Sequence, residues 1–160
     1  MTIKVGDRVP SASLKHMTAD GMQTITTDQL FKGKKVVLFA LPGAFTPTCS
    51  AKHLPGFVQN AETIKGKGVD TIACLSVNDA FVMNAWGKDQ KVGDKVLMLA
   101  DGNADFSKAV GLTMDGTGYG MGTRAQRYAM VVQDGVVKAL NVEAPGAFEV
   151  SSAESIIKAL

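Results

Sequence analysis

The chain has 160 residues, of which 46% are hydrophobic, a length and composition that fit one domain needing no disulfide, so we expect residues 1–160 to form a single domain. Its 17 lysine and arginine residues nearly balance 15 aspartate and glutamate residues and form no basic run, which argues against nucleic acid and anionic membranes as partners. The first ten residues lack the apolar core of a signal peptide, and no apolar run reaches the roughly 18 residues of a membrane span, so we expect a soluble, cytoplasmic protein.

The first half of the chain predicts a hairpin, a short helix and then a β-α-β unit. The hairpin turns at Asp20-Gly21, and the short helix covers residues 27–31. Residues 35–41 form a short, nearly all-apolar and β-rich run, which is typical of a strand buried on both faces. A helix from Thr46 to Lys65 follows, because apolar residues recur there at three- and four-residue spacing. A second buried strand at residues 69–77 completes a right-handed unit.

The second half continues the alternation and then changes to an antiparallel pattern. The expected elements are a helix at residues 78–90, a strand at 95–101, two strands at 127–133 and 136–142, and a closing helix at 152–160. Asp134-Gly135 separates the last two strands and is a strong hairpin signal. This order predicts an α/β protein with a thioredoxin-like three-layer α/β/α fold and an N-terminal extension.

Cysteine is scarce, and Cys49 lies where a helix is expected to begin. Thr46 suits the N-cap and Pro47 the first helical position, which makes Cys49 the third helical residue. Its sulfur would then lie near unpaired backbone N–H groups and the positive end of the helix dipole, an environment that favours a reactive thiolate. The alternative is a small apolar filler on the buried side of the helix.

The loop from Pro42 to Thr46 follows a central strand, at the edge of the sheet where α/β proteins bind ligands. A dithiol oxidoreductase needs C-x-x-C, but the first position here is Thr46, so disulfide exchange of the thioredoxin kind is disfavoured. The Thr46 hydroxyl is instead free to turn toward the sulfur and a substrate oxygen.

The pattern P-x-x-x-T-x-x-C, formed by Pro42, Thr46 and Cys49, resembles the active-site motif of the peroxiredoxins. The longer strings PGAFTPTCSAKHLPGF, IACLSVNDAFVMNAWG and RYAMVVQDGVVKALNVE are similar to the type II, or peroxiredoxin-five, subfamily, and the resemblance runs from about residue 3 to 160. It implies a peroxidase without bound cofactor, in which the Cys49 thiolate attacks hydrogen peroxide or an alkyl hydroperoxide and becomes a sulfenic acid.

The resemblance also implies roles for the surrounding residues and for partners. Thr46 would bond to sulfur and peroxide, Pro42 would shield the site, and Arg127 would stabilise the thiolate and the developing oxyanion. The sulfenic acid would be recycled by an external thiol, glutathione with glutaredoxin or else thioredoxin. Type II members commonly form homodimers through the loops that frame the site, here around Phe45 and residues 78–81.

Other residues have weaker claims. Arg124 is a second choice beside Arg127, and His53 is either a general base or a residue that lines the helix. Cys49 and His53 lack a third and fourth ligand, so no metal site is expected. The glycine-rich residues 115–124 do not join a strand to a helix in a G-x-G-x-x-G frame and predict a mobile surface loop.

Three further features complete the expectations. We expect Trp86 in the core and Phe45 as a wall of the pocket. Cys74 lies inside a central strand and is expected to be structural; the segment GAFEVSSAES offers no resolving cysteine, since it carries only Ser151 and Ser152. Two other functions stay open: a redox-sensing or chaperone-like partner protein, and a non-catalytic thioredoxin-fold binding module.

Overall fold

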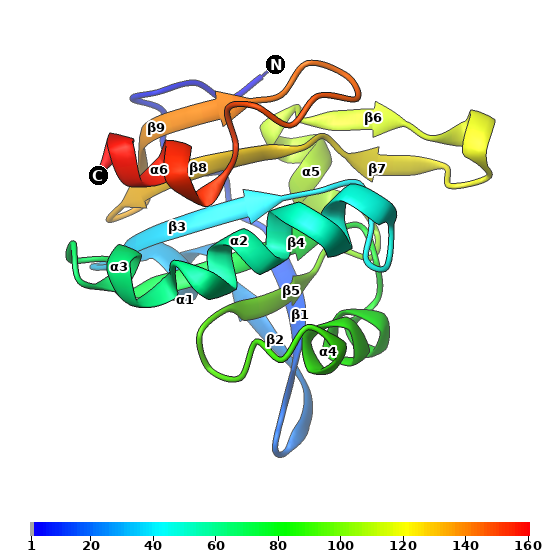
Figure 1. The fold of residues 1–160 in the computed structure, drawn as a ribbon, viewed down its shortest axis with the longest axis horizontal. Coiled ribbons are helices and arrows are strands. Elements are labelled where there is room, and N and C mark those ends of the chain that lie inside the picture. The colour runs from blue at the N-terminus through cyan, green and yellow to red at the C-terminus, as the bar shows by residue number, and fades with distance from the viewer. Residues whose placement is uncertain (1) are drawn as a thin grey trace.

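Residues 2–160 are described by a computed structural model, in which a seven-stranded mixed sheet lies between two layers of helices (Figure 1). The strand order is β2-β1-β5-β4-β3-β8-β9. The strands of this sheet are β1 (Ser13–Thr18), β2 (Gly21–Thr26), β3 (Lys35–Ala40), β4 (Thr71–Ser76), β5 (Leu97–Ala100), β8 (Tyr128–Gln133) and β9 (Val136–Val142). The α-helices are α1 (Thr27–Phe31), α2 (Leu54–Gln59), α3 (Ala61–Lys65), α4 (Ala80–Asp89), α5 (Asp105–Val110) and α6 (Ala153–Ala159).

The centre of the sheet is formed by β3, β4 and β5, which run parallel, with β8 antiparallel to β3. Both β3 and β4 are buried along almost their whole length, as the apolar runs of the sequence predict. The hairpin between β8 and β9 turns at Asp134 and Gly135, whose φ angles of 49° and 80° are those that an Asp-Gly turn favours.

Alternate residues of β3 face different helix layers. Val37 and Phe39 pack in one core with α2, α3, α4 and α6, whereas Val36 and Leu38 pack in the other with α1 and α5. The predicted three-layer fold with its N-terminal β1–β2 extension is therefore confirmed. Among residues 2–160, no helix combines the length and the apolar character needed to cross a membrane.

The surface loop expected at residues 115–124 is shorter than predicted, because its two ends are strands. The chain there forms a small separate hairpin of β6 (Thr113–Asp115) and β7 (Thr123–Ala125), joined through a 3-10 turn at Thr117–Tyr119 (Figure 1). Helix α5 was not predicted either. Each of these pieces is short, and strands of three residues carry too little alternation to be detected.

The single helix expected from Thr46 to Lys65 is interrupted by a π-turn and by a break at Asn60. Pro47 and Thr48 are helical, a π-turn spans Cys49–His53, and Asn60 separates α2 from α3. The π-turn has a local cause. Pro55 has no N–H to donate to the carbonyl four residues earlier and its ring crowds that carbonyl, so the backbone widens, and the N–H of Leu54 reaches back five residues to Cys49.

Candidate active site

Cys49 lies at the start of a helix beyond the carboxyl end of β3. The loop from Leu41 to Thr46 leaves the central strand, and helical backbone begins at Pro47, as the sequence predicts. Cys49 is only 1% exposed. The position combines a central strand end with the start of a helix, which is where α/β proteins place reacting groups.

The guanidinium of Arg127 is the cation at this sulfur. Arg127 lies between β7 and β8, and its Nη2 donates to the Cys49 Sγ at 3.1 Å, while its Nη1 lies 2.9 Å from the Nδ1 of His53. The Cζ atom of Arg127 lies over the ring of Phe148, 5.9 Å from the ring centroid. Arg127 is thus held on three sides, with one N–H directed at the sulfur.

His53 is buried in an aromatic cage, and its two ring nitrogens have different partners. The ring centroids of Phe39, Phe57 and Phe148 lie 5.0, 5.7 and 5.1 Å from that of His53. Its Nε2 lies 3.0 Å from the carbonyl oxygen of Ser151. Burial, and then the positive charge of Arg127, lower the pKa of His53 to about 3, so the ring is neutral at physiological pH.

Thr46 does not make the contact with sulfur that the resemblance implies. Its hydroxyl donates to the carbonyl of Gly43 at 2.7 Å, within the loop itself. The same loop is held from outside: Arg124 donates to the Pro42 carbonyl at 3.3 Å and, through its Nε, to Met121 at 2.9 Å. Arg124 therefore supports the Pro42 loop and makes no hydrogen bond with the sulfur.

Gly43 lies where Arg124 approaches the loop closely, so a larger residue there would have to displace the Arg124 side chain. A Cβ built at Gly43 would lie 3.0 Å from Arg124 Nη1 and 3.1 Å from the Thr46 methyl carbon. On its other side, the loop is tied to the end of β4 by the side chain of Asn78, which accepts from the Ala44 N–H at 3.0 Å. The loop is thus fixed by both the β6–β7 hairpin and the central sheet.

A pocket of about 530 Å³ opens beside the guanidinium of Arg127. It is lined by Pro42, Thr48, Thr113, Met114, Tyr119, Gln126, Arg127, Glu143 and residues 144–147. Its walls come from the β6–β7 hairpin and from the loop after β9. Phe45, expected as a wall of this pocket, is not among the lining residues; its side chain is 54% exposed, with its ring centroid 6.4 Å from that of Trp86.

Glu143 is a part of the site that the sequence analysis missed. It follows β9 and is buried, and its carboxylate accepts hydrogen bonds from the backbone N–H groups of Glu149, Val150 and Ser151 and from the Ser151 hydroxyl. Burial opposes its ionisation, but the Ser151 hydroxyl and the three N–H groups outweigh burial and lower the pKa of Glu143. These hydrogen bonds cannot be predicted from residue spacing, because the Glu143 carboxylate meets residues 149–151 only when the loop after β9 folds back on itself.

Cys74 has a different environment. It lies in the middle of β4, fully buried, and belongs to the same hydrophobic core as Cys49; both cysteines are free. Burial, and then the proximity of Cys49, raise the pKa of the Cys74 thiol well above its ordinary value. Trp86 is buried in this core, as expected, and donates to the Ser50 hydroxyl at 3.1 Å.

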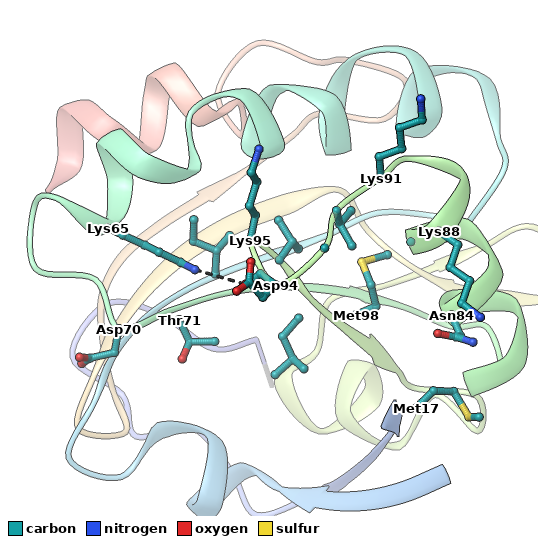
Figure 2. A pocket seen from close by; sticks show the side chains of 16 residues that line it. Met17, Lys65, Asp70, Thr71, Asn84, Lys88, Lys91, Asp94, Lys95 and Met98 are labelled. Carbon is teal, nitrogen blue, oxygen red and sulfur yellow. Dashed lines mark hydrogen bonds between the residues drawn. The ribbon is translucent and has the colours of Figure 1, made fainter. Parts of the chain in front are cut away.

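A second pocket, of about 510 Å³, has neither Cys49 nor Arg127 in its lining (Figure 2). Its lining includes the starts of β4 and β5, at the amino ends of the parallel strands, and the lysines Lys65, Lys88, Lys91 and Lys95. Lys65 reaches across to the carbonyl of Asp94 at 3.3 Å. None of the residues that the sequence selected as functional lines this pocket.

Comparisons with known proteins cover almost the whole chain. The Redoxin family matches residues 4–157. The chain is 54% identical to Peroxiredoxin-2E-2, chloroplastic, of Oryza sativa subsp. japonica over 164 residues, which cover 99% of this chain and 73% of that protein. It is 48% identical to Peroxiredoxin-2B of Arabidopsis thaliana over 159 residues, 99% of this chain and 98% of that one. The crystal structure of reduced Prx3 from Vibrio vulnificus in complex with H2O2 superposes with a TM-score of 0.96 at 56% identity, covering 99% of each chain.

Proposed function

Because the chain belongs to the peroxiredoxins, the thiol peroxidases of the Redoxin family, we propose that Cys49 supplies the thiolate that attacks the peroxide. Membership in this family makes the chain an enzyme and removes the non-catalytic binding module that the sequence left open. The observation that carries the proposal is the 3.1 Å contact between Arg127 Nη2 and Cys49 Sγ at the start of a helix.

The reaction has a simple balance of bonds and electrons. The sulfur attacks one peroxide oxygen, an S–O bond forms as the O–O bond breaks, and the leaving oxygen takes the electron pair and then a proton. Sulfur is oxidised to a sulfenic acid, and the peroxide is reduced to water or an alcohol. A guanidinium beside the sulfur favours the thiolate and stabilises the negative charge that develops on the leaving oxygen.

Thr46 and Pro42 have supporting roles in this proposal. The Thr46 hydroxyl uses its proton on Gly43, so its oxygen lone pairs can accept a hydrogen bond from the O–H of a peroxide. Pro42 lines the pocket at the loop that Arg124 holds, where it limits access of water to the sulfur.

The substrates proposed are hydrogen peroxide and alkyl hydroperoxides. H2O2 is bound in the solved structure of the Vibrio vulnificus relative. The pocket beside Arg127 is larger than that ligand needs, and the side chains of Met114, Tyr119 and Pro145 in its lining suit an alkyl group.

A thiol reductant follows from the family, and we propose that it is external: glutathione with glutaredoxin, or thioredoxin. We also propose the type II assignment, a cytoplasmic location, and a homodimer through the loops around Phe45 and Phe81. Phe45 and Phe81 are 54% and 63% exposed, which is unusual for large apolar side chains.

The test is peroxide consumption by the wild type, Cys49→Ser and Cys74→Ser, with each reductant system supplied in turn. We expect Cys49→Ser to be inactive and Cys74→Ser to keep most of the activity. Comparable losses in both variants would overturn the assignment of Cys49, and the preferred reductant follows from the faster system.

A further inference from the structure

The hydrogen bonds at Arg127 continue beyond His53 and close into a ring. From Arg127 they lead to His53, from His53 to the Ser151 carbonyl, and from Ser151 to the Glu143 carboxylate. The backbone N–H of Glu143 donates to the carbonyl of Arg127 itself at 3.0 Å. The loop after β9 is thereby connected to the guanidinium through both backbone and side chain.

The partners of His53 allow only one tautomer. Arginine has donors and no acceptor, so the Nδ1 that faces Arg127 Nη1 must be the unprotonated nitrogen. A backbone carbonyl only accepts, so the Nε2 that faces Ser151 must carry the proton. A doubly protonated ring would direct an N–H at a guanidinium N–H, which agrees with the pKa of about 3.

This tautomer matters because a guanidinium is planar. When Nη1 is held on the lone pair of His53, the orientation of the plane is set and Nη2 is directed at the sulfur. The ring of His53 cannot easily turn, because three aromatic rings enclose it. Ser151, in turn, presents its carbonyl in a fixed direction only while Glu143 holds its N–H and its hydroxyl, at 2.8 and 2.7 Å.

We propose that His53 and Glu143 are positioning residues for the peroxidase reaction: neutral His53 orients Arg127 toward Cys49, and Glu143 fixes the tautomer of His53 through the carbonyl of Ser151. Neither residue donates a proton to the reacting atoms or removes one from them. The proposal rests on the roles proposed above for Cys49 and Arg127.

The first test separates orientation from packing by comparing His53→Asn with His53→Leu. Asparagine keeps an amide oxygen near the position of Nδ1 that can accept from Arg127, whereas leucine fills the aromatic cage better but accepts nothing. We expect stopped-flow oxidation of Cys49 by H2O2 to slow about tenfold or more in His53→Leu, the cost of losing a charged hydrogen bond, and to slow less in His53→Asn. Thermal unfolding should rank the two in the opposite order. A packing role predicts that the leucine variant is the faster enzyme, and that result would overturn the proposal.

The second test acts from a distance through Glu143→Gln, which keeps the shape but replaces one acceptor oxygen by an NH2 group that faces the loop N–H groups. We expect Cys49 oxidation and neutral-pH alkylation of Cys49 to slow together, by about tenfold, since a charged hydrogen-bond acceptor is lost. Glu154→Gln is the matched control, because Glu154 is exposed in the first turn of α6 and should leave both rates unchanged. Unchanged rates in Glu143→Gln would remove Glu143 from the proposal.

A pH profile excludes the general-base alternative for His53. Because the ring is already neutral, the rate of Cys49 oxidation should depend on pH in the same way in wild type and in His53→Asn between pH 5 and 8. Loss of an ionisation in His53→Asn would make His53 a base and overturn the proposal. Failure of the proposed function would appear differently, as slow oxidation of wild-type Cys49 or as an Arg127→Gln variant as fast as wild type.

Discussion

Arg127 connects a thiol that the sequence marks with a histidine that it leaves ambiguous. One side chain donates to both Cys49 Sγ and His53 Nδ1, at 3.1 and 2.9 Å. Only a planar fork of N–H groups makes two such contacts in fixed directions. The charge and the geometry of arginine are therefore both used at this site.

Replacing Arg127 separates these two contributions. Arg127→Gln should slow Cys49 oxidation by about 10² to 10³, the usual cost of losing one donor to a developing oxyanion. Arg127→Lys keeps the charge, but its single nitrogen cannot occupy the positions of both Nη1 and Nη2, so it should recover only a small part of the lost rate. Stopped-flow single turnovers with H2O2 measure both, and a lysine variant as fast as wild type would mean that charge alone suffices.

The neutral state of His53 should also be visible in stability against pH. Its pKa of about 3 in the native protein compares with 6.5 for the free side chain. Below about pH 6.5, His53 in an unfolded chain gains a proton that the native protein does not bind. The part of the free energy of unfolding that depends on neutral His53 is therefore fully present above that pH and is lost as the pH falls. The free energy of unfolding should fall by up to about 1.4 kcal/mol per pH unit.

Urea unfolding between pH 6.5 and 5 tests this slope, since Glu143, with its lowered pKa, responds only at lower pH. The slope should become shallower in His53→Leu. His16→Leu, a change on strand β1, is the control, and its slope should stay as in wild type. Equal slopes in wild type and His53→Leu would mean that the native ring binds its proton normally.

At the site, the sequence predicts residues better than it predicts contacts. A local motif is enough to find Pro42, Thr46 and Cys49, because the three residues lie within eight positions of the chain. Glu143 and the Ser151 carbonyl act across a folded loop, and a backbone carbonyl leaves no mark on the sequence. The Thr46 hydroxyl was expected to bond to the sulfur but donates to the carbonyl of Gly43.

Among the elements, long periodic segments are predicted and short irregular ones are not. The buried strands β3 and β4 and the Asp-Gly hairpin follow from apolar runs and a turn signal. Helix α5 begins after Ala104 in a left-handed conformation, and its first N–H groups are capped by Asp101, several residues earlier. A capping residue this far from the helix along the sequence cannot be recognised from the sequence alone.

The π-turn at Cys49–His53 gives a prediction at the scale of the helix. A regular helix would change the angular separation of Cys49 and His53, both of which contact Arg127. Pro55→Ala restores an N–H and allows regular bonding, so we expect equal or greater stability together with an oxidation rate about tenfold lower, since small misplacements of reacting groups are costly. Thermal unfolding measures the stability of this variant, and stopped flow measures its oxidation rate. An unchanged rate would mean that Pro55 does not set this geometry.

For the whole molecule, the exposed aromatic side chains near the site give a prediction about assembly. Phe81 at the start of α4 is 63% exposed, and its burial in a dimer would remove a large apolar surface from water. We expect wild type to sediment as a dimer at micromolar concentration and Phe81→Asp as a monomer. Met22→Asp on the distant β1–β2 hairpin is the control, since Met22 is 48% exposed and should leave the dimer intact. A wild type that is entirely monomeric contradicts the proposal.

The arrangement of layers also bears on the proposal that an external thiol resolves a sulfenic acid on Cys49. Cys74 lies in the middle of the central sheet, whereas Cys49 lies in the helix layer that covers it. A disulfide needs the two Cα atoms within about 7 Å and Cβ atoms that point across, and Cys74 cannot move without disturbing two neighbouring strands. The high pKa of Cys74 leaves little thiolate to attack.

An external thiol meets neither obstacle, because it is neither fixed in a strand nor buried in the core, and sulfenic acids condense readily with thiols. We therefore expect mass spectrometry after one equivalent of peroxide, without added thiol, to find Cys49 as sulfenic or overoxidised acid in both wild type and Cys74→Ser. Addition of glutathione should convert Cys49 to the mixed disulfide in both. A quantitative Cys49–Cys74 disulfide within one wild-type chain would instead mean that the first helical turn unwinds during each catalytic cycle, and the proposal of an external resolving thiol would be wrong.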